Sequence, residues 1–198
     1  MNRQPGGANR DGSRAGYTIF EILMVLAVLV LILSLAWPTV QSFQSEYRVR
    51  QSGQLVQARL AAARVHAVES GQTYQFRFEP GGQRFLVLPV DQQALLAPAQ
   101  GKRPKKLAGI LPSEKAMFDP SSTGSAGGQQ IPGEWLAGIP DADKFGGATW
   151  SAPAYFYADG TASAVRLVIR DKKSHMVTVS VRPLTGSVSV SKVERGAQ

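Results

Sequence analysis

The sequence predicts an α+β protein in which one long N-terminal helix packs on antiparallel β-sheet. Two observations predict this fold class. Up to Ser70, apolar residues first run almost unbroken and then recur at three-to-four spacing, which is typical of a helix. Beyond Gly71 the spacing changes to two, and short apolar runs alternate with Gly- and Pro-containing turns, which is typical of antiparallel strands.

Length and composition limit the classes of protein that the chain can belong to. The 198 residues include no cysteine, so a disulfide framework, a thiolate metal site and a cysteine nucleophile are excluded. Beyond the N-terminal apolar run, about 150 residues remain, enough for one domain with its own core. The net charge of +8 could favour an anionic partner, although an ordinary solvated surface is the better explanation.

The N-terminal helix starts with an unusual apolar segment. A leader with three arginines ends at Gly16 and Tyr17 follows. From there to Trp37, Glu21 is the only side chain that is charged at neutral pH. A helix from Tyr17 to Trp37 would be about 31 Å long, close to the hydrocarbon thickness of a bilayer. A carboxylate in such a helix is costly and indicates a functional site. If the chain is cut after Gly16, the new amine of Tyr17 could pair with Glu21, within one chain or between neighbours.

These residues resemble the processing signal of type IV pilins and pseudopilins. The resemblance rests on the basic leader, Gly16, the aromatic Tyr17, Glu21 at its fixed distance and the apolar run. In that family a prepilin peptidase cuts after the glycine and methylates the new N-terminus, and the glutamate guides packing into the filament. The resemblance therefore implies cleavage and methylation at Gly16 and Tyr17, filament assembly through Glu21, and a helix kink at Pro38.

Two other kinds of N-terminal segment are weaker explanations. A cleaved secretory signal has a short apolar region followed by a small-residue cleavage site, and no such site follows Trp37. A plain signal anchor explains the apolar run but neither Gly16 nor Glu21. Whether the segment is a pilin-type helix or a plain signal anchor, the arginines of the leader predict a cytoplasmic N-terminus and a C-terminal domain on the outer side.

After Pro38 the helix is expected to continue in amphipathic form. Apolar residues recur at three-to-four spacing, and we expect this face to pack on the soluble domain: Val40, Phe43, Tyr47, Leu55, Ala58, Ala62, Val65 and Val68. Ser70 and Gly71 are a stop signal. The predicted segments are a cleaved leader (1–16), a transmembrane and filament-core helix (17–38), an amphipathic helix (39–71) and a globular antiparallel β domain (72–198).

The β domain is expected to begin with a hairpin. Residues 73–79 and 84–88 alternate around a turn at Pro80 to Gln83. Short strands are expected at 107–111 and 116–118. Four further strands, at 154–157, 164–169, 176–181 and 188–193, are expected to form an antiparallel meander, and residues 194–198 a frayed tail.

The middle of the chain offers two weak candidate sites. The basic cluster Lys102, Arg103, Lys105 and Lys106 could contact an anion or nucleic acid, but no aromatic residue is interleaved for stacking, so a solvated loop is the better interpretation. Asp141 and Asp143 have the spacing of a calcium loop but no third ligand nearby. We predict no metal and no cofactor.

No catalytic pattern occurs in the sequence. His66 lies in the amphipathic helix, where packing between helix and sheet explains it, and His175 lies at a hairpin edge. Neither belongs to a nucleophile or metalloprotease motif, and there is no phosphate loop or dinucleotide fingerprint. The sequence predicts a protein that is not an enzyme.

A second resemblance narrows the family. The segment 60–71 before a hairpin, the run Phe156 to Gly160, and Leu184 to Gly186 resemble the GspH/FimT branch of minor pseudopilins. This implies a pilin-like H-type minor pseudopilin of the type II secretion pseudopilus, a structural subunit at or near the filament tip. Its partners would be other major and minor pseudopilins, prepilin peptidase and inner-membrane lipid. It would be a single-pass bacterial inner-membrane protein with a periplasmic domain, and part of the pseudopilus after assembly.

The alternatives are a FimT-like minor pilin of a type IV pilus or DNA-uptake filament, and a signal-anchored periplasmic protein. DNA-binding members of the branch tend to carry arginines after the final turn glycine. Here Ser187, Val188 and Ser189 follow Gly186, which disfavours nucleic acid as a partner without excluding it.

Overall fold

The fold is α+β, with one long helix and two antiparallel sheets. The structure is a computed structural model that describes residues 18–91, 105–126 and 128–196, with the backbone alone for residues 35–43. Helix α1 runs over Ile19–Ser70, 52 residues. By its internal contacts the chain forms two compact units, Met1–Gln41 and Ser42–Gln198, so the first part of α1 belongs to one unit and the second part to the other.

The first sheet has the order β3-β2-β1-β5. Its strands are β1 (Tyr74–Phe78), β2 (Arg84–Pro89), β3 (Leu107–Ile110) and β5 (Ala154–Phe156). The predicted hairpin is confirmed: β1 and β2 pair antiparallel, with Phe78 opposite Phe85. The backbone at the turn also bonds across, since the Glu79 N–H donates to the carbonyl of Arg84 at 2.9 Å.

The second sheet has the order β4-β6-β7-β8, with β9 also on β7. Its strands are β4 (Ala116–Phe118), β6 (Val165–Asp171), β7 (His175–Val181), β8 (Val188–Val190) and β9 (Glu194–Arg195). The alternating burial of β6 and β7 shows one face packed in the core and one facing outward.

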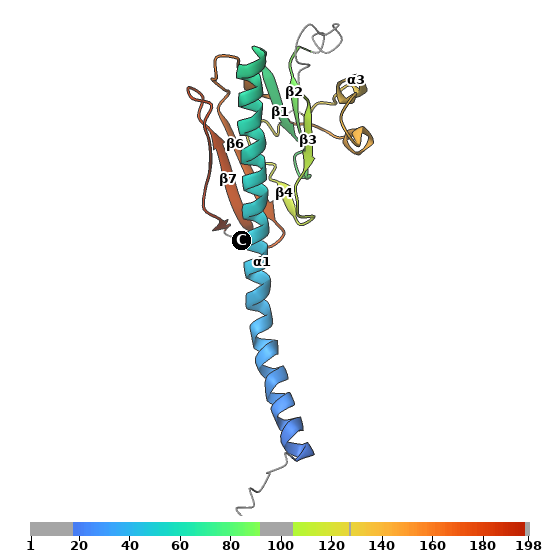
Figure 1. Cartoon of the computed structure of the whole chain (residues 1–198), viewed down its shortest axis with the longest axis vertical. Helices are drawn as coiled ribbons and strands as arrows, with labels where there is room; N and C mark the ends of the chain where they lie inside the picture. The colour runs from blue at the N-terminus through green and yellow to red at the C-terminus, as the bar shows by residue number, and fades with distance from the viewer. Residues whose placement is uncertain (1–17, 92–104, 127, 197–198) are drawn as a thin grey trace, which may run out of the picture. The chain divides into compact units, whose positions relative to one another are not determined.

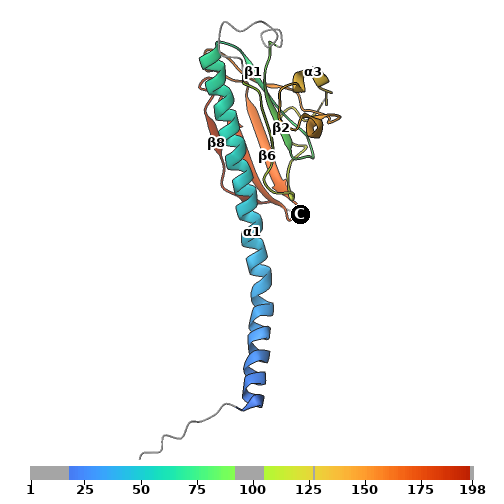
Figure 2. The same ribbon diagram turned by 45° about the vertical axis from the view of Figure 1, so that its right-hand side comes forward.

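The main core lies between α1 and both sheets, as Figures 1 and 2 show for the part of α1 beyond Ser42. Eight described residues of α1 are buried on this side of the helix: Ser45, Val49, Ser52, Gly53, Val56, Leu60, Ala63 and Ala67. Opposite them lie aromatic side chains of the first sheet and branched aliphatic side chains of the second, among them Phe76, Phe85 and Ile169. A Cβ at Gly53 would lie 2.9 Å from Val177 Cγ1, so glycine allows the helix to approach β7 closely.

The predicted packing face of α1 is wrong at most described positions, although Leu55 is partly buried against the main core. The side chains of Val40 and Phe43 lie outside the described residues. Tyr47 is 67% exposed, Val65 48% and Val68 51%, while Ala58 is exposed as well. The sequence contains two three-to-four patterns about half a turn apart, and the buried one is built from Val49, Val56, Leu60 and alanines. The larger side chains Tyr47, Val65 and Val68, which dominated the predicted pattern, lie on the outside.

A second core covers the other face of β1 and β2. Leu86 and Leu88 pack there against Leu136, Phe145 and Trp150, which come from the segment around α3 (Gly133–Leu136) and the 3₁₀ helix η1 (Ala142–Phe145). Both faces of β1 are therefore buried, and Gln75 and Arg77 lie inside. The long Gly- and Pro-rich connection is thus a packed lobe on the first sheet.

Two further expectations about the C-terminal strands are wrong. The strand at residues 154–156 pairs with β1 and belongs to the first sheet, so it is no part of the meander. Residues Glu194 and Arg195 pair with Met176 and His175 as β9, where a frayed tail was expected. In both cases the partner strand is distant in sequence, so local spacing did not reveal the pairing.

Candidate functional site

The first part of α1 carries large apolar side chains that nothing in the described chain covers. Between Ile19 and Leu33 they range in exposure from 49% at Val28 to 82% at Ile19. They include residues on every side of the helix, because consecutive residues from Ile22 to Leu26 are each more than half exposed. A helix that is apolar all round is usually buried by other chains or by lipid. We define Thr18–Ser34 as the apolar segment.

Glu21 lies in the first turn of the apolar segment and has a local role there. The backbone N–H of Glu21 donates to Thr18 Oγ1 at 3.2 Å and to the Thr18 carbonyl at 3.1 Å. Thr18 precedes the first helical residue, so it caps the helix, and Glu21 stands at the third helical position as in a capping box. The negative charge also suits the helix N-terminus. The sequence contained this Thr-x-x-Glu signal, but sequence reasoning missed it.

Of the other N-terminal residues predicted to have a role, the structure describes only the backbone of Pro38. Gly16 and Tyr17 lie outside the described residues, so the pairing of Glu21 with a Tyr17 amine stays a prediction. The α1 backbone continues through Pro38, whose side chain is not described, and the kink stays a prediction. Among the described residues, none of the helices has the length and apolar character needed to cross a membrane.

The predicted basic cluster is divided between described and undescribed residues. Lys102 and Arg103 lie outside the described range. The Lys105 backbone N–H donates to Tyr74 Oη at 3.1 Å. The Lys106 ammonium donates to the carbonyls of Trp135 and Ala137, both at 2.9 Å, and burial lowers its pKa. Lys106 therefore ties β3 to the end of α3, and its role in binding an anion stays a prediction.

The two histidines make structural contacts. His66 is tilted against Tyr74, with ring centroids 6.0 Å apart, which is the helix-to-sheet packing expected of it. His175 is buried, and its Nδ1 lies 3.4 Å from Asp171 Oδ2. The other oxygen of Asp171 accepts the backbone N–H groups of Lys173 and His175. This network organises the β6–β7 turn.

The acidic pair Asp141 and Asp143 lies at η1. Asp141 precedes that helix in the left-handed region, at φ 55°, and pairs with the Lys144 ammonium at 3.1 Å. Within the described ranges, no group of three or more His, Asp or Glu side chains is placed to hold a metal ion.

Comparisons with known proteins give one similar structure. It is the minor pseudopilin EpsH from the type 2 secretion system of Vibrio cholerae, at 15% identity and a TM-score of 0.46, covering 73% of this chain and 97% of that one. No protein family and no curated protein matches the sequence. EpsH belongs to the class that the N-terminal motif resembles. Because the similarity is low, the proposed role rests on this chain's own residues.

Proposed function

We propose that the chain is a structural subunit of a pseudopilin-type filament, the H-type minor pseudopilin at or near the tip of a type II secretion pseudopilus. The observation that carries this is the apolar segment, whose side chains from Ile19 to Leu33 stay exposed while the second part of α1 is packed on two sheets. Such a segment needs an outside partner, because about 25 cal/mol is lost for each Å² of apolar surface left in water.

Within this proposal the apolar segment has two successive partners. In the precursor it is held by inner-membrane lipid, with the leader in the cytoplasm and the domain in the periplasm. After prepilin peptidase cuts at Gly16 and methylates Tyr17, it packs against the corresponding helices of other pseudopilins. Glu21 is exposed on the first turn and would neutralise the N-terminal amine of a neighbouring subunit.

Intact mass of the protein extracted from membranes tests the processing step. In cells with the matching peptidase, we expect the wild type to lack residues 1–16 and to carry one added methyl group. Gly16→Ala should stay full length, whereas Gly12→Ala, a matched glycine change inside the leader, should be processed normally. A wild type that keeps its leader in these cells would contradict the proposal and favour a plain membrane anchor.

Removing the carboxylate of Glu21 tests the assembly step. We expect Glu21→Gln to be processed but to form far fewer cross-links with neighbouring subunits, because it cannot neutralise a positive N-terminus. Glu46→Gln removes an exposed carboxylate from the second part of the same helix and should cross-link as the wild type does. Equal cross-linking by Glu21→Gln and the wild type would contradict the proposed role of Glu21 in assembly.

A further inference from the structure

The unit Ser42–Gln198 has one end at which α1 joins it from the apolar segment. Several pairings place the same group of elements at this end. Gly53 lies against Val177 of β7, so the start of β7 and the β6–β7 turn lie toward the N-terminal side of α1 in this unit. Ala116 pairs with Asp171 at that turn, and β9 pairs with the first two residues of β7. Figure 1 shows these elements together near the C-terminus.

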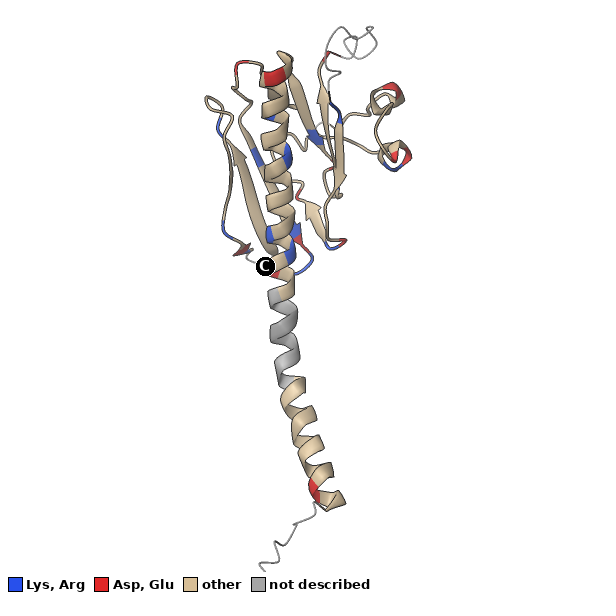
Figure 3. Cartoon of the chain, in the orientation of Figure 1, with Lys and Arg blue, Asp and Glu red and all other residues tan. Residues whose placement is uncertain are grey.

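Positive charge gathers at this end, which we call the basic end. It carries six exposed cationic residues: Arg50, Lys115, Lys172, Lys173, Lys192 and Arg195. Arg170 is exposed there too, but its guanidinium is paired with Asp119 at 2.9 Å. Against them stand three exposed carboxylates, those of Glu46, Glu114 and Glu194. Figure 3 shows the blue segments around the lower end of this unit.

The remaining described surface of the unit is nearly balanced in charge. Its exposed carboxylates are Glu69, Asp91, Glu134, Asp141, Asp143 and Asp159. Its exposed cations are Lys105, Lys144, Arg166 and Arg182, and its half-buried charged residues are the cations Arg59, Arg64, Arg84 and Lys106 and the carboxylate Glu79. The unit therefore has a positive end and a remainder that is nearly neutral, so an anionic surface would attract and orient it by that end.

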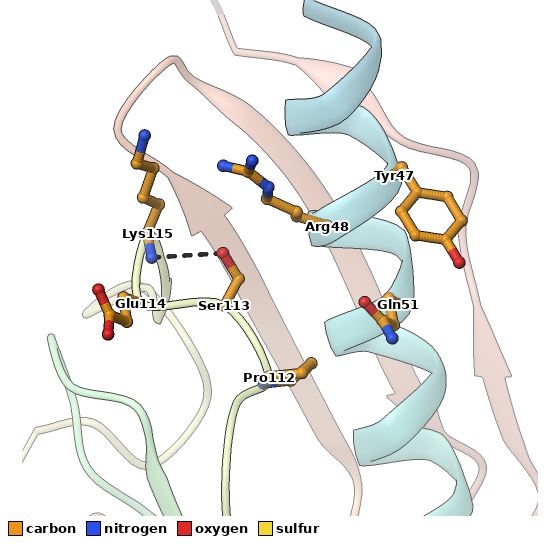
Figure 4. Close-up of a pocket in the computed structure, with 7 residues that line it drawn as sticks. All are labelled: Tyr47, Arg48, Gln51, Pro112, Ser113, Glu114 and Lys115. Atoms are coloured by element: carbon orange, nitrogen blue, oxygen red, sulfur yellow. Dashed lines mark hydrogen bonds between the residues drawn. The ribbon is translucent and has the colours of Figure 1, made fainter. Parts of the chain in front are cut away.

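A groove at the basic end brings two cationic side chains together. It has a volume of about 510 Å³ and lies between α1, at Tyr47, Arg48 and Gln51, and the loop of residues 112–115. Figure 4 shows the Arg48 guanidinium and the Lys115 ammonium extending toward the same end of the groove. The loop is held by the Lys115 backbone N–H, which donates to Ser113 Oγ at 3.3 Å, and the Arg48 guanidinium donates to Gln44 at 3.1 Å.

We propose that the basic end binds the anionic headgroups of a lipid bilayer. The inference rests on the proposed function, in which the apolar segment lies in lipid before assembly. In the sequence only residues 35–43 separate that segment from the unit that carries the basic end. Basic residues next to a membrane anchor gain affinity from anionic lipid over a distance of about a Debye length, roughly 8–10 Å. The groove between Arg48 and Lys115 would take a headgroup phosphate.

Flotation of the full-length chain with lipid vesicles tests the proposal. Binding is measured with phosphatidylcholine vesicles and with vesicles that also contain phosphatidylglycerol, and the ratio is the gain from anionic lipid. We expect this gain to be at least about tenfold at low salt and to shrink as salt rises. The variant Lys115→Glu/Lys172→Glu/Arg195→Glu should lose most of the gain. Its control, Lys105→Glu/Arg166→Glu/Arg182→Glu, carries the same charge change elsewhere and should keep it.

The outcomes separate this inference from the proposed function. Binding to phosphatidylcholine depends on the apolar segment, so its loss would contradict the proposed function, whereas a missing gain from phosphatidylglycerol would overturn only this inference. Equal losses in the two triple variants would also overturn it, since net charge alone would then explain the gain. Binding of duplex DNA is measured as well. If Lys115→Glu/Lys172→Glu/Arg195→Glu loses binding to duplex DNA but keeps its gain from phosphatidylglycerol, the inference is also overturned. The neutral variant Lys115→Gln/Lys172→Gln/Arg195→Gln should lose a smaller part of the gain than the glutamate variant does. Its unfolding is measured in parallel and should show that it is folded.

Discussion

The two parts of α1 differ in what covers their apolar side chains. In the second part, Val49, Val56 and Leu60 are fully buried by the chain's own sheets. In the first part, the valines and leucines of the apolar segment are about half exposed or more, and no other described element covers them. The same helix therefore contributes side chains to a completed core in one unit and carries an uncovered apolar surface in the other. The proposed covering of the first part by molecules outside the chain would account for this difference.

The largest effect is expected from truncating one leucine in each part. Leu60→Ala should lower the free energy of unfolding of the full chain in detergent by about 2–5 kcal/mol, because it leaves a cavity between α1 and the sheets. Leu29→Ala, where the leucine is 53% exposed, should change it by less than about 0.5 kcal/mol. Denaturant unfolding measures both. Similar losses from the two variants would mean that the first part is covered by its own chain.

A smaller effect is expected from the polar group buried beneath the lobe. The Arg77 guanidinium donates to Gln75, Gln129 and the Ser151 carbonyl, and burial lowers its pKa. Arg77→Ala should lower the free energy of unfolding by about 1–3 kcal/mol, because it leaves buried acceptors unpaired.

The exposed Arg166 is the matched control for this change. Thermal unfolding of both arginine variants and the wild type is the measurement, and in it Arg166→Ala should cost less than about 0.5 kcal/mol. If Arg77→Ala unfolds at the wild-type temperature, then the lobe around Trp150 is not part of the cooperative unit.

The cap at the start of the apolar segment should have a local effect only. Thr18→Ala removes the acceptor for the Glu21 N–H and should ease opening of the first turn by about 1 kcal/mol, roughly a fivefold faster amide exchange. Ser34→Ala removes a hydroxyl that donates to the Leu31 carbonyl within the helix. This variant should leave amide exchange in the first turn of α1 unchanged. A change in unfolding of the β-sheets by Thr18→Ala would contradict the independence of the two parts.

The smallest effect is a dependence of stability on pH in the first hairpin. Arg84 donates two hydrogen bonds to Glu79, at 2.8 and 2.6 Å, and these bonds are the main cause of the lowered pKa of Glu79. A lowered pKa stabilises the fold above the unfolded value of about 4.3, and this contribution disappears as pH falls through the folded value.

We expect Glu79→Gln to remove this acid-dependent part, by no more than about 1 kcal/mol for an exposed or half-exposed pair. The measurement is the unfolding temperature between neutral pH and about pH 3. If the difference in unfolding temperature between wild type and variant stays constant over that range, then the Glu79–Arg84 pair contributes nothing to the dependence of stability on pH.

Local signals predicted the class and most elements of the fold. The helix ends at Ser70 as its stop signal indicates, and the hairpin at Pro80 and Gly81 follows from turn chemistry. What the sequence did not reveal depends on distant contacts. Periodicity shows that Val65 and Val68 share a face, but only the packing of Val56 and Leu60 on both sheets shows that the opposite face is the buried one.

The candidate site was predicted in outline and missed in detail. The isolated Glu21 stands out in the sequence because it is the one ionisable group in an apolar run, and the structure adds its position in the first turn with Thr18 as the cap. The contacts of Lys106 with Trp135 and Ala137 could not be foreseen, because they join residues about thirty positions apart through a lobe without periodicity.

Labelling of single cysteines tests the central claim most directly, because the chain has no cysteine of its own. In membranes from producing cells, Val28→Cys should resist a water-soluble maleimide, whereas Gln54→Cys, an exposed position in the second part of α1, should react fully. Both should react after unfolding. The account predicts protection at residue 28 because other molecules cover the apolar segment. Full reaction at both positions in intact membranes would contradict it.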